Sequence, residues 1–522
     1  MSLLVLVLLP LAGGLLAWAL GGRRPAAARW VCLGALAGDL LLLVPRLRGG
    51  GWPARVDLPW LPELGIGVRL GLDGLSLPLV LLTLVLGALA VAASWREIET
   101  RTGLFHLCLM AVLSGVLGVF LALDLILFYL FWELMLVPMA LLLALWGHER
   151  RRYATLKFFL FTQAGGLLML VAIVSRALTG AGVTGRLTFA YEGLLGVPAV
   201  VSPWLAFAFF LGLAVKLPAF PLHPWLPDAH TEAPTGGSVV LAGLLLKTGG
   251  YAMLRFGVPL FPEAATTFAR PAMVLGVAGI LYGALAAVAQ TDVKRLVAYT
   301  SVSHMGFVLL GVFSLDDTAW RGVVAQMVCH GLSTGGLFVV AGLLQERLGT
   351  RDLRRFGGLW ASMPRLGGLA LVLALASLGL PGLGNFVAEI LILVGTFRVE
   401  PVLAAVAAGG LVLSALYSLR LLQRAFHGPF AGGATPADLD LRETAALGAS
   451  VLLLLWIGLY PRPLLRMSGP VVDTLLTGRG ADVEAEASPP AARGEETAAR
   501  SPVVVHESGH GGRSERDAGG AR

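Results

Sequence analysis

Apolar residues in this chain occur in long runs, and short polar segments separate one run from the next. A helix of about 20 apolar residues crosses the hydrocarbon core of a bilayer. Runs of that size predict fourteen membrane-spanning helices, near residues 2–20, 30–46, 75–94, 104–122, 125–146, 153–175, 203–226, 235–256, 271–289, 296–314, 321–343, 366–397, 401–423 and 442–460. The pattern therefore predicts an all-α polytopic membrane protein with about 14 transmembrane helices.

Two of the expected spans contain helix breakers in their middle. Four prolines follow Lys216 in the seventh span, and Pro381 and Gly382 interrupt the twelfth. Proline removes a helix hydrogen bond, and broken helices in corresponding positions of two halves are typical of inverted-repeat transporters. We therefore predict two inverted five-helix repeats, spans four to eight and nine to thirteen, with broken helices 7 and 12.

The chain changes character after its last apolar run. Residues 1–462 hold the expected spans and form the predicted transmembrane domain. Residues 463–522 are rich in Ala, Gly, Glu and Arg, and such a segment buries too little apolar surface to fold. We predict a polar, disordered C-terminal tail, with a binding role for the tail as the alternative.

Composition supports a membrane protein and excludes a soluble one. Only 14% of the 522 residues are charged, whereas a soluble domain carries about 25%. The net charge of +7 does not indicate nucleic-acid binding, because most arginines lie in expected loops. Loops after odd-numbered spans hold roughly twice as many Lys and Arg as the others, which places them in the cytoplasm and both termini outside. The first span has no basic segment before it, which favours a retained span over a cleaved signal peptide.

Metal and cofactor signatures are weak. The three cysteines are isolated and form no CxxC pair: Cys32, Cys108 and Cys329. They support neither an iron–sulfur cluster nor a disulfide framework. No GxGxxG follows a strand pattern, so no dinucleotide site is indicated. Three further residues could act as metal ligands, although their loop is rich in proline: His223, Asp228 and His230. We expect no metal and no cofactor on this chain.

Ionisable residues inside the expected spans are the candidate functional groups: Glu133, Lys216, Lys247, His304, His330 and Glu389. A charge at the bilayer centre costs about 2.5–3.5 kcal/mol, so such residues are paired or mark an ion pathway. Lys216 ends the first half of span seven, where the negative end of the helix dipole favours a cation. Asn385 is expected to cap the second half of span twelve, whose positive end favours an anion at Glu389.

Proton transfer is the chemistry that these residues suggest. Burial favours the neutral form of Lys247, and a nearby carboxylate favours the charged form, so a movable partner would load and release a proton. Glu133 is the expected partner of Lys216. His304 and His330 could relay protons, because a neutral imidazole accepts a proton near physiological pH. The alternatives are static salt bridges that fix helix register and histidines that only pack in the core.

Four segments carry a specific resemblance: LFYLFWELMLVPMALLLALWG, KLPAFPLHPWLPDAHTEAPTGGSVVLAGLLLKTGGY, QTDVKRLVAYTSVSHMGFVLLG and LPGLGNFVAEILIL. They are similar to the antiporter-like membrane subunits of bacterial NADH–quinone oxidoreductase, respiratory complex I, a family shared with multisubunit cation/proton antiporters. The resemblance covers residues 70–430. Pro224 stands where the family has glycine, so the conformation of that loop is not carried over.

The resemblance assigns roles to the intramembrane residues. The family's functional glutamate in span five falls on Glu133, and its lysines in spans seven and eight fall on Lys216 and Lys247. The histidine of span ten falls on His304, and the ionisable residue of span twelve falls on Glu389. The sister subunits L and N look as if they carry lysine at that last position, so the glutamate separates this chain from them.

The resemblance also implies an activity and a setting. It implies proton pumping in the bacterial cell inner (plasma) membrane, coupled to NADH-to-quinone electron transfer in partner subunits. NADH, FMN, iron–sulfur clusters and quinone are expected on those partners, which include the membrane-arm subunits L and N. The other expected contact is the lipid bilayer, and none is with nucleic acid. The alternatives are a subunit of a multisubunit Na+/H+ antiporter, a subunit of an energy-converting hydrogenase, and a scaffold whose charges only hold helices together.

Overall fold

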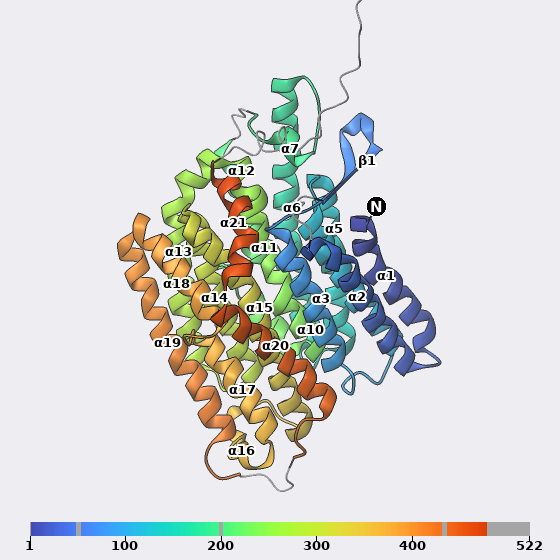
Figure 1. Cartoon of the computed structure of the whole chain (residues 1–522), viewed down its shortest axis with the longest axis vertical. Helices are drawn as coiled ribbons and strands as arrows, with labels where there is room; N and C mark the ends of the chain where they lie inside the picture. The colour runs from blue at the N-terminus through green and yellow to red at the C-terminus, as the bar shows by residue number, and fades with distance from the viewer. Residues whose placement is uncertain (1, 49–53, 198–201, 431–435, 478–522) are drawn as a thin grey trace, which may run out of the picture. The chain divides into compact units, whose positions relative to one another are not determined.

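The computed structural model describes residues 2–48, 54–197, 202–430 and 436–477. Its helices run side by side (Figure 1), and twelve helical stretches of the described part are long and apolar enough to cross a membrane. Eleven of them are single helices: α1 Ser2–Gly21, α2 Pro25–Arg48, α3 Ser76–Ala93, α4 Thr102–Leu121, α5 Leu125–Trp146, α6 Arg151–Thr184, α13 Pro262–Ala289, α14 Val293–Phe313, α15 Asp317–Leu348, α19 Pro401–Phe426 and α20 Leu441–Leu459. The predicted all-α membrane fold is confirmed.

The two remaining spans are divided, as predicted. The seventh consists of α8 Pro203–Lys216 and α9 Trp225–Glu232, and the twelfth of α17 Pro364–Ser377 and α18 Gly384–Val399. Gly379 lies in the second break with a φ of +78°, a conformation that residues with a Cβ rarely adopt. Glycine therefore permits this turn between the two half-helices. The inverted relation of the two five-span groups stays a prediction.

The eighth span is a continuous helix with two π-helical turns inside it. Its parts are α10 Thr235–Val240, the π segment η2 Leu241–Leu245, α11 Leu246–Ala252, the π segment η3 Met253–Gly257 and α12 Val258–Leu260. Lys247 lies in α11, between the two π segments. Short π turns inside α-helices are rare and occur often at functional sites.

The central helices are shielded from the surroundings. Every residue in the most apolar stretch of the eighth span and of α15 is buried, whereas α1, α2, α19 and α20 leave most of theirs accessible. The eighth span contacts α4, α8, α14 and α15. Side chains that point inward from these helices are therefore held by protein and not by lipid.

Two elements lie outside the predicted pattern. A hairpin of β1 Ala54–Leu61 and β2 Ile66–Leu72 follows α2, and α21 Arg462–Thr477 follows α20. The search for long apolar runs missed α21 because it is short and only one of its faces is apolar. Leu464 and Val472 on that face are buried, two helical turns apart. The segment assigned to a polar tail from residue 463 thus begins with a helix, while residues from 478 onward lie outside the described part.

The loops separate into two groups. After the odd-numbered spans, the backbone N–H of His148 bonds the carbonyl oxygen of Glu232 at 2.9 Å. After the even-numbered spans, Asp124 forms an isolated bridge with Ala190. Because loops contact others of their own group, these contacts agree with a chain that crosses the membrane at every span.

Candidate functional site

Lys247 anchors the site at the centre of the buried helices. Its ammonium group donates a hydrogen bond to the backbone carbonyl of Ala242 in the π segment η2. Its Nζ also lies 2.6 Å from Nδ1 of His330 on α15. Lys247 and His330 are both fully buried. A side chain that bonds into the helix ladder accounts for the local π geometry.

His304 on α14 and Glu389 on α18 form the second part of the site. Nδ1 of His304 lies 3.0 Å from Oε1 of Glu389. On the other side of the ring, Nε2 lies 3.3 Å from the Ser377 hydroxyl and 3.4 Å from the Tyr417 hydroxyl. The amide Nε2 of Gln326 is 3.2 Å from Nδ1 of His304 and 3.3 Å from Oε1 of Glu389.

The two histidines connect these parts. Their ring centroids are 5.2 Å apart and the ring planes are nearly perpendicular. Lys247, His330, His304 and Glu389 therefore lie next to one another from the eighth span to the twelfth, although Nε2 of His330 has no hydrogen-bond partner among the described residues. All four are at least 98% buried, so a proton that moves along them is separated from both lipid and bulk water.

Glu133 and Lys216, the predicted pair, are not in contact. Among the described residues, Nζ of Lys216 has no hydrogen-bond partner, and no carboxylate lies within ion-pair distance of it. The ammonium group instead lies over the ring of Trp132, 5.0 Å from its centroid, a cation–π contact. Lys216 and Glu133 therefore form no direct ion pair in this conformation, although the charge of each group still interacts with that of the other. Tyr129 and Gln163 are the polar neighbours of its carboxylate.

Glycines make room for both carboxylates. A Cβ on Gly166 in α6 would lie 2.7 Å from Oε1 of Glu133, and a Cβ on Gly379 would lie 2.7 Å from Oε2 of Glu389. Real Cβ atoms do not approach an oxygen that closely. Each carboxylate therefore occupies space that only glycine leaves free.

The predicted helix-end effects hold in one case and fail in the other. Lys216 is the last residue of α8, where its charge complements the helix dipole. Asn385 does not cap α18, because Leu383 occupies the cap position. The Asn385 amide instead donates a hydrogen bond to the hydroxyl of Ser333 at 3.3 Å. It ties α18 to α15.

The proposed metal ligands are not grouped. Asp228 accepts from Nζ of Lys157 at 2.7 Å and from Nη1 of Arg295 at 3.1 Å. His230 stacks on Phe338 with centroids 4.3 Å apart. No cluster of three or more His, Cys, Asp or Glu with metal-binding geometry occurs in the part of the chain that the structure describes.

His148 lies outside the spans, in the loop between α5 and α6. Its Nε2 is 3.5 Å from Nζ of Lys294 and 3.3 Å from the amide of Gln345. Burial, followed by the positive charges of Lys294 and Arg351, lowers the pKa of His148 to about 4. The imidazole is therefore neutral at physiological pH and accepts a hydrogen bond.

Other buried polar groups lie apart from the site. Asp39 in α2 is fully buried, and neither of its carboxylate oxygens has a hydrogen-bond partner among the described residues. Cys32, Cys108 and Cys329 are buried free thiols.

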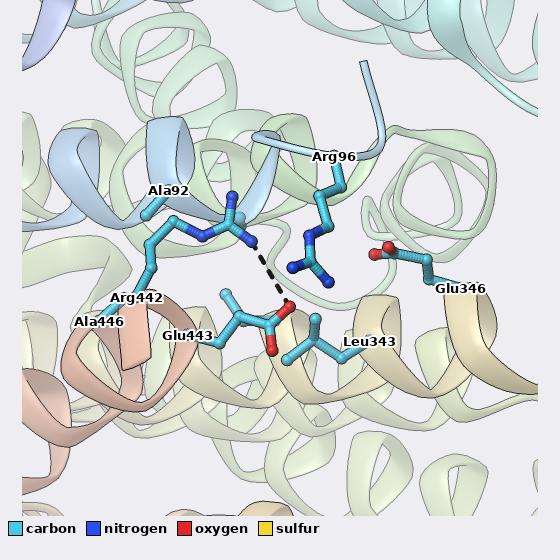
Figure 2. Close-up of a pocket in the computed structure, with 9 residues that line it drawn as sticks. Ala92, Arg96, Leu343, Glu346, Arg442, Glu443 and Ala446 are labelled. Atoms are coloured by element: carbon cyan, nitrogen blue, oxygen red, sulfur yellow. Dashed lines mark ion pairs between the residues drawn. The ribbon is translucent and has the colours of Figure 1, made fainter. Parts of the chain in front are cut away.

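A surface pocket is also separate from this site. Figure 2 shows Arg96 and Arg442 facing Glu346 and Glu443 between the ends of α3, α15 and α20. Nη2 of Arg442 is 3.5 Å from Oε1 of Glu443. None of the predicted site residues lines the pocket. Arg96 pairs with Asp440 at 3.1 Å, so these ion pairs connect the ends of the helices.

Sequence analysis missed four residues that the structure brings to the site: Trp132, Gln326, Ser377 and Tyr417. Gln326 could have been found, because it precedes His330 by four residues and so shares its face of the helix. Ser377 and Tyr417 reach His304 from distant parts of the chain, and no local pattern marks them.

Comparisons with known proteins agree with this geometry. A family model described as "NADH:quinone oxidoreductase/Mrp antiporter, TM" matches residues 122–416. The chain belongs to this family. Every predicted site residue falls within the matched segment.

Individual members of the NADH:quinone oxidoreductase/Mrp antiporter family are similar over nearly their whole length. NADH-quinone oxidoreductase subunit M of Pseudomonas aeruginosa is 50% identical over 486 residues, which cover 89% of this chain and 95% of that protein. A chain of respiratory complex I from Thermus thermophilus superposes with a TM-score of 0.84 at 36% identity, over 92% of this chain and all of that chain. A chain of the Mrp complex from Dietzia sp. has the same fold, with a TM-score of 0.81 at 21% identity over 92% of this chain and 99% of that one.

Proposed function

We propose that this chain is a proton-translocating membrane-arm subunit of an NADH–quinone oxidoreductase, in the place that its relatives called subunit M hold. One observation carries the proposal: Lys247, His330, His304 and Glu389 follow one another through the buried core. Buried ionisable residues are expensive in a membrane protein and mark ion pathways. Here they are consecutive, and each can bind and release a proton.

A proton can move along these groups in short steps. Lys247 gives a proton to Nδ1 of His330 across 2.6 Å, and His330 releases one from Nε2, which has no hydrogen-bond partner among the described residues, to a water molecule between the two rings. His304 accepts it and passes a proton from Nδ1 to Glu389 across 3.0 Å. Each passage leaves the N–H of an imidazole on the other ring nitrogen, so both histidines must return to their first tautomer before the next proton passes. One proton then enters for each one that leaves.

Glu133 and Lys216 supply the control in this proposal. A carboxylate near an ammonium group favours the charged lysine, and its withdrawal favours release of the proton. With the two groups apart and Lys216 over Trp132, the arrangement corresponds to the releasing condition. A charge that arrives from a neighbouring subunit would bring Glu133 back and reload Lys216. When Glu133 withdraws again, the proton moves from Lys216 toward Lys247.

Two substitutions test this control. Lys216→Met and Glu133→Gln should both reduce the number of protons moved per electron in membrane vesicles, while electron transfer to quinone continues. An unchanged proton-to-electron ratio in both variants would contradict the mechanism.

The proposed chemistry needs no cofactor on this chain. Electrons pass from NADH to quinone through FMN and iron–sulfur clusters on partner subunits, and this chain responds to the charge they produce. The proposed neighbours are the antiporter-like subunits L and N of the same membrane arm. The chain is a multi-pass protein of the bacterial inner membrane.

Native gel electrophoresis of mildly solubilised membranes tests the assignment. Detection of this chain in a very large complex that stains for NADH dehydrogenase activity supports the proposal. Migration in a smaller complex without that activity would identify the alternative, a multisubunit Na+/H+ antiporter, which the family description also covers. Assembly with unchanged pumping in every charge variant would identify a scaffold.

A further inference from the structure

Three polar atoms at the end of the proposed pathway lie in mutual contact. Nδ1 of His304, Oε1 of Glu389 and Nε2 of Gln326 are separated by 3.0, 3.2 and 3.3 Å. The other amide atom, Oε1 of Gln326, is buried and has no hydrogen-bond partner in the described part of the chain. A buried carbonyl oxygen without a donor is unfavourable. In the Gln326 amide, Nε2 therefore has hydrogen-bond partners and Oε1 has none among the described residues.

The number of protons on the His304–Glu389 pair decides which amide atom fits beside it. With one shared proton, Oε1 of Glu389 accepts from the Gln326 amide, as observed. With two protons, one on Nδ1 and one on Oε1 of Glu389, both groups become donors. The amide N–H then opposes them, whereas the amide oxygen could accept from both.

The remaining neighbours of His304 do not impose this choice. Ser377 and Tyr417 contact Nε2 through hydroxyl groups, and a hydroxyl rotates to donate or accept. An amide must turn as a whole to exchange its donor for its acceptor. Among these contacts, Gln326 is therefore the one whose orientation depends on the number of protons on the His304–Glu389 pair.

We propose that Gln326 is a positioning residue whose amide turns by about 180° when the His304–Glu389 pair takes up its second proton. The turn gives the orphan oxygen two donors and stabilises the doubly protonated pair. Release of one proton restores the observed orientation. The two orientations of the amide thus match the singly and the doubly protonated forms of the pair, and the second form holds an excess proton. This inference deepens the proposed function and rests on it.

Infrared difference spectroscopy of the intact complex tests the turn. The protonated Glu389 carboxyl is assigned as the band that disappears in Glu389→Gln. In Gln326→Met, which has a similar length and no amide, that band should move to higher frequency because the acid loses its hydrogen bond. Proton pumping should fall roughly tenfold, the effect of losing a hydrogen bond to an ionised group. An unmoved band would overturn the inference.

Two variants separate a polar role from a packing role. Thr334→Val lies two turns further along α15 and removes a hydroxyl that has no hydrogen-bond partner among the described groups, so pumping and the Glu389 band should stay as in the unaltered complex. Gln326→Glu should keep partial pumping at low pH, where its protonated acid offers both a donor and an acceptor. The titratable groups that face Glu389 in this experiment are His304 from α14, Cys329 from α15 and Tyr417 from α19, and His330 faces His304.

The outcomes distinguish the inference from the function beneath it. If Gln326→Met pumps normally while Lys247→Met does not, Gln326 has no role and the pathway stands. If both variants pump normally, the proposed function fails with it. No rescue by Gln326→Glu over Gln326→Met at any pH would also count against the turning amide.

Discussion

The two broken spans differ in how their charges are satisfied. At the first, the Lys216 ammonium group lies over the ring of Trp132, and among the described residues neither that group nor one oxygen of Glu133 has a hydrogen-bond partner. At the second, one oxygen of Glu389 likewise has no partner among those residues, but its Oε1 bonds His304 and Gln326, and His304 reaches two hydroxyls beyond. One region is sparse and the other is densely hydrogen-bonded.

This difference indicates which of the two regions responds to a change in charge on a neighbouring subunit. A buried charge without a partner has the most to gain from a small displacement of a neighbour, because its interaction energy is large at low dielectric. A hydrogen-bonded network resists displacement and instead stores or passes protons. The sparse region is suited to respond to other subunits, and the dense region to hold the proton.

The largest effect is expected at Lys247, which stands between the two regions. Lys247→Met removes the only ammonium group that contacts His330 in the described structure. Proton pumping in vesicles should drop by roughly tenfold or more, because a positioned proton carrier contributes at least that much to transfer. Leu246→Met, the neighbouring buried position, conserves volume and should pump normally. Pumping above a third of the control rate in Lys247→Met would contradict a shared path.

The next effect compares stability at the two breaks. Lys216→Met removes an unpaired buried charge, so the complex should withstand heat as well as before or better. His304→Leu removes a partner of Glu389, Gln326, Ser377 and Tyr417, and each buried group left unsatisfied costs about 1–3 kcal/mol. Its temperature of subunit loss should fall by several degrees, as measured by native gels after heating. Equal losses in both variants would show that the regions do not differ in this way.

A smaller effect is expected at Gly166. Gly166→Ala places a methyl group against the Glu133 carboxylate and should lower pumping several-fold by displacing it. Gly182→Ala on the same helix meets nothing within 4 Å and provides the matched control. Proton-to-electron ratios in vesicles would decide, and identical ratios in the two variants would remove Gly166 from the site.

The smallest effect concerns the loop end of the first broken span, where the backbone of His148 bonds that of Glu232. The pKa of His148 is lowered by burial and by Lys294 and Arg351 to about 4. The unfolded chain binds a proton near pH 6.5, so the stability that depends on neutral His148 is complete above that pH and declines as pH falls toward 4. His148→Gln should lose less heat resistance between pH 7.5 and 5 than the unaltered complex. A larger acid loss in the variant would reverse the sign of this argument.

The sequence predicted the spans and the breaks well, because both depend on local chemistry. Apolar length and proline position are read directly from the residues around Lys216 and Pro381. It also located the ionisable residues, but not their contacts. The Asn385 cap was wrong, and Glu133 and Lys216 interact at a distance without a direct ion pair, because contacts depend on how helices pack. The hairpin, α21 and the π turns escaped notice for a related reason, since none of them requires a long apolar run.

One π turn lies on each side of Lys247. Each π turn contains one residue more than an α-helical turn, and this extra residue is a local defect in the helix, comparable to a dislocation in a row of a crystal. Such a defect travels by exchanging one backbone hydrogen bond at a time. The residues that it passes rotate by about 100° around the helix axis, one residue's share of a turn. With a defect on each side, the helix can swing the lysine from one neighbour to another while both of its ends stay in place. The middle of the eighth span then rotates about the helix axis, and its two ends do not.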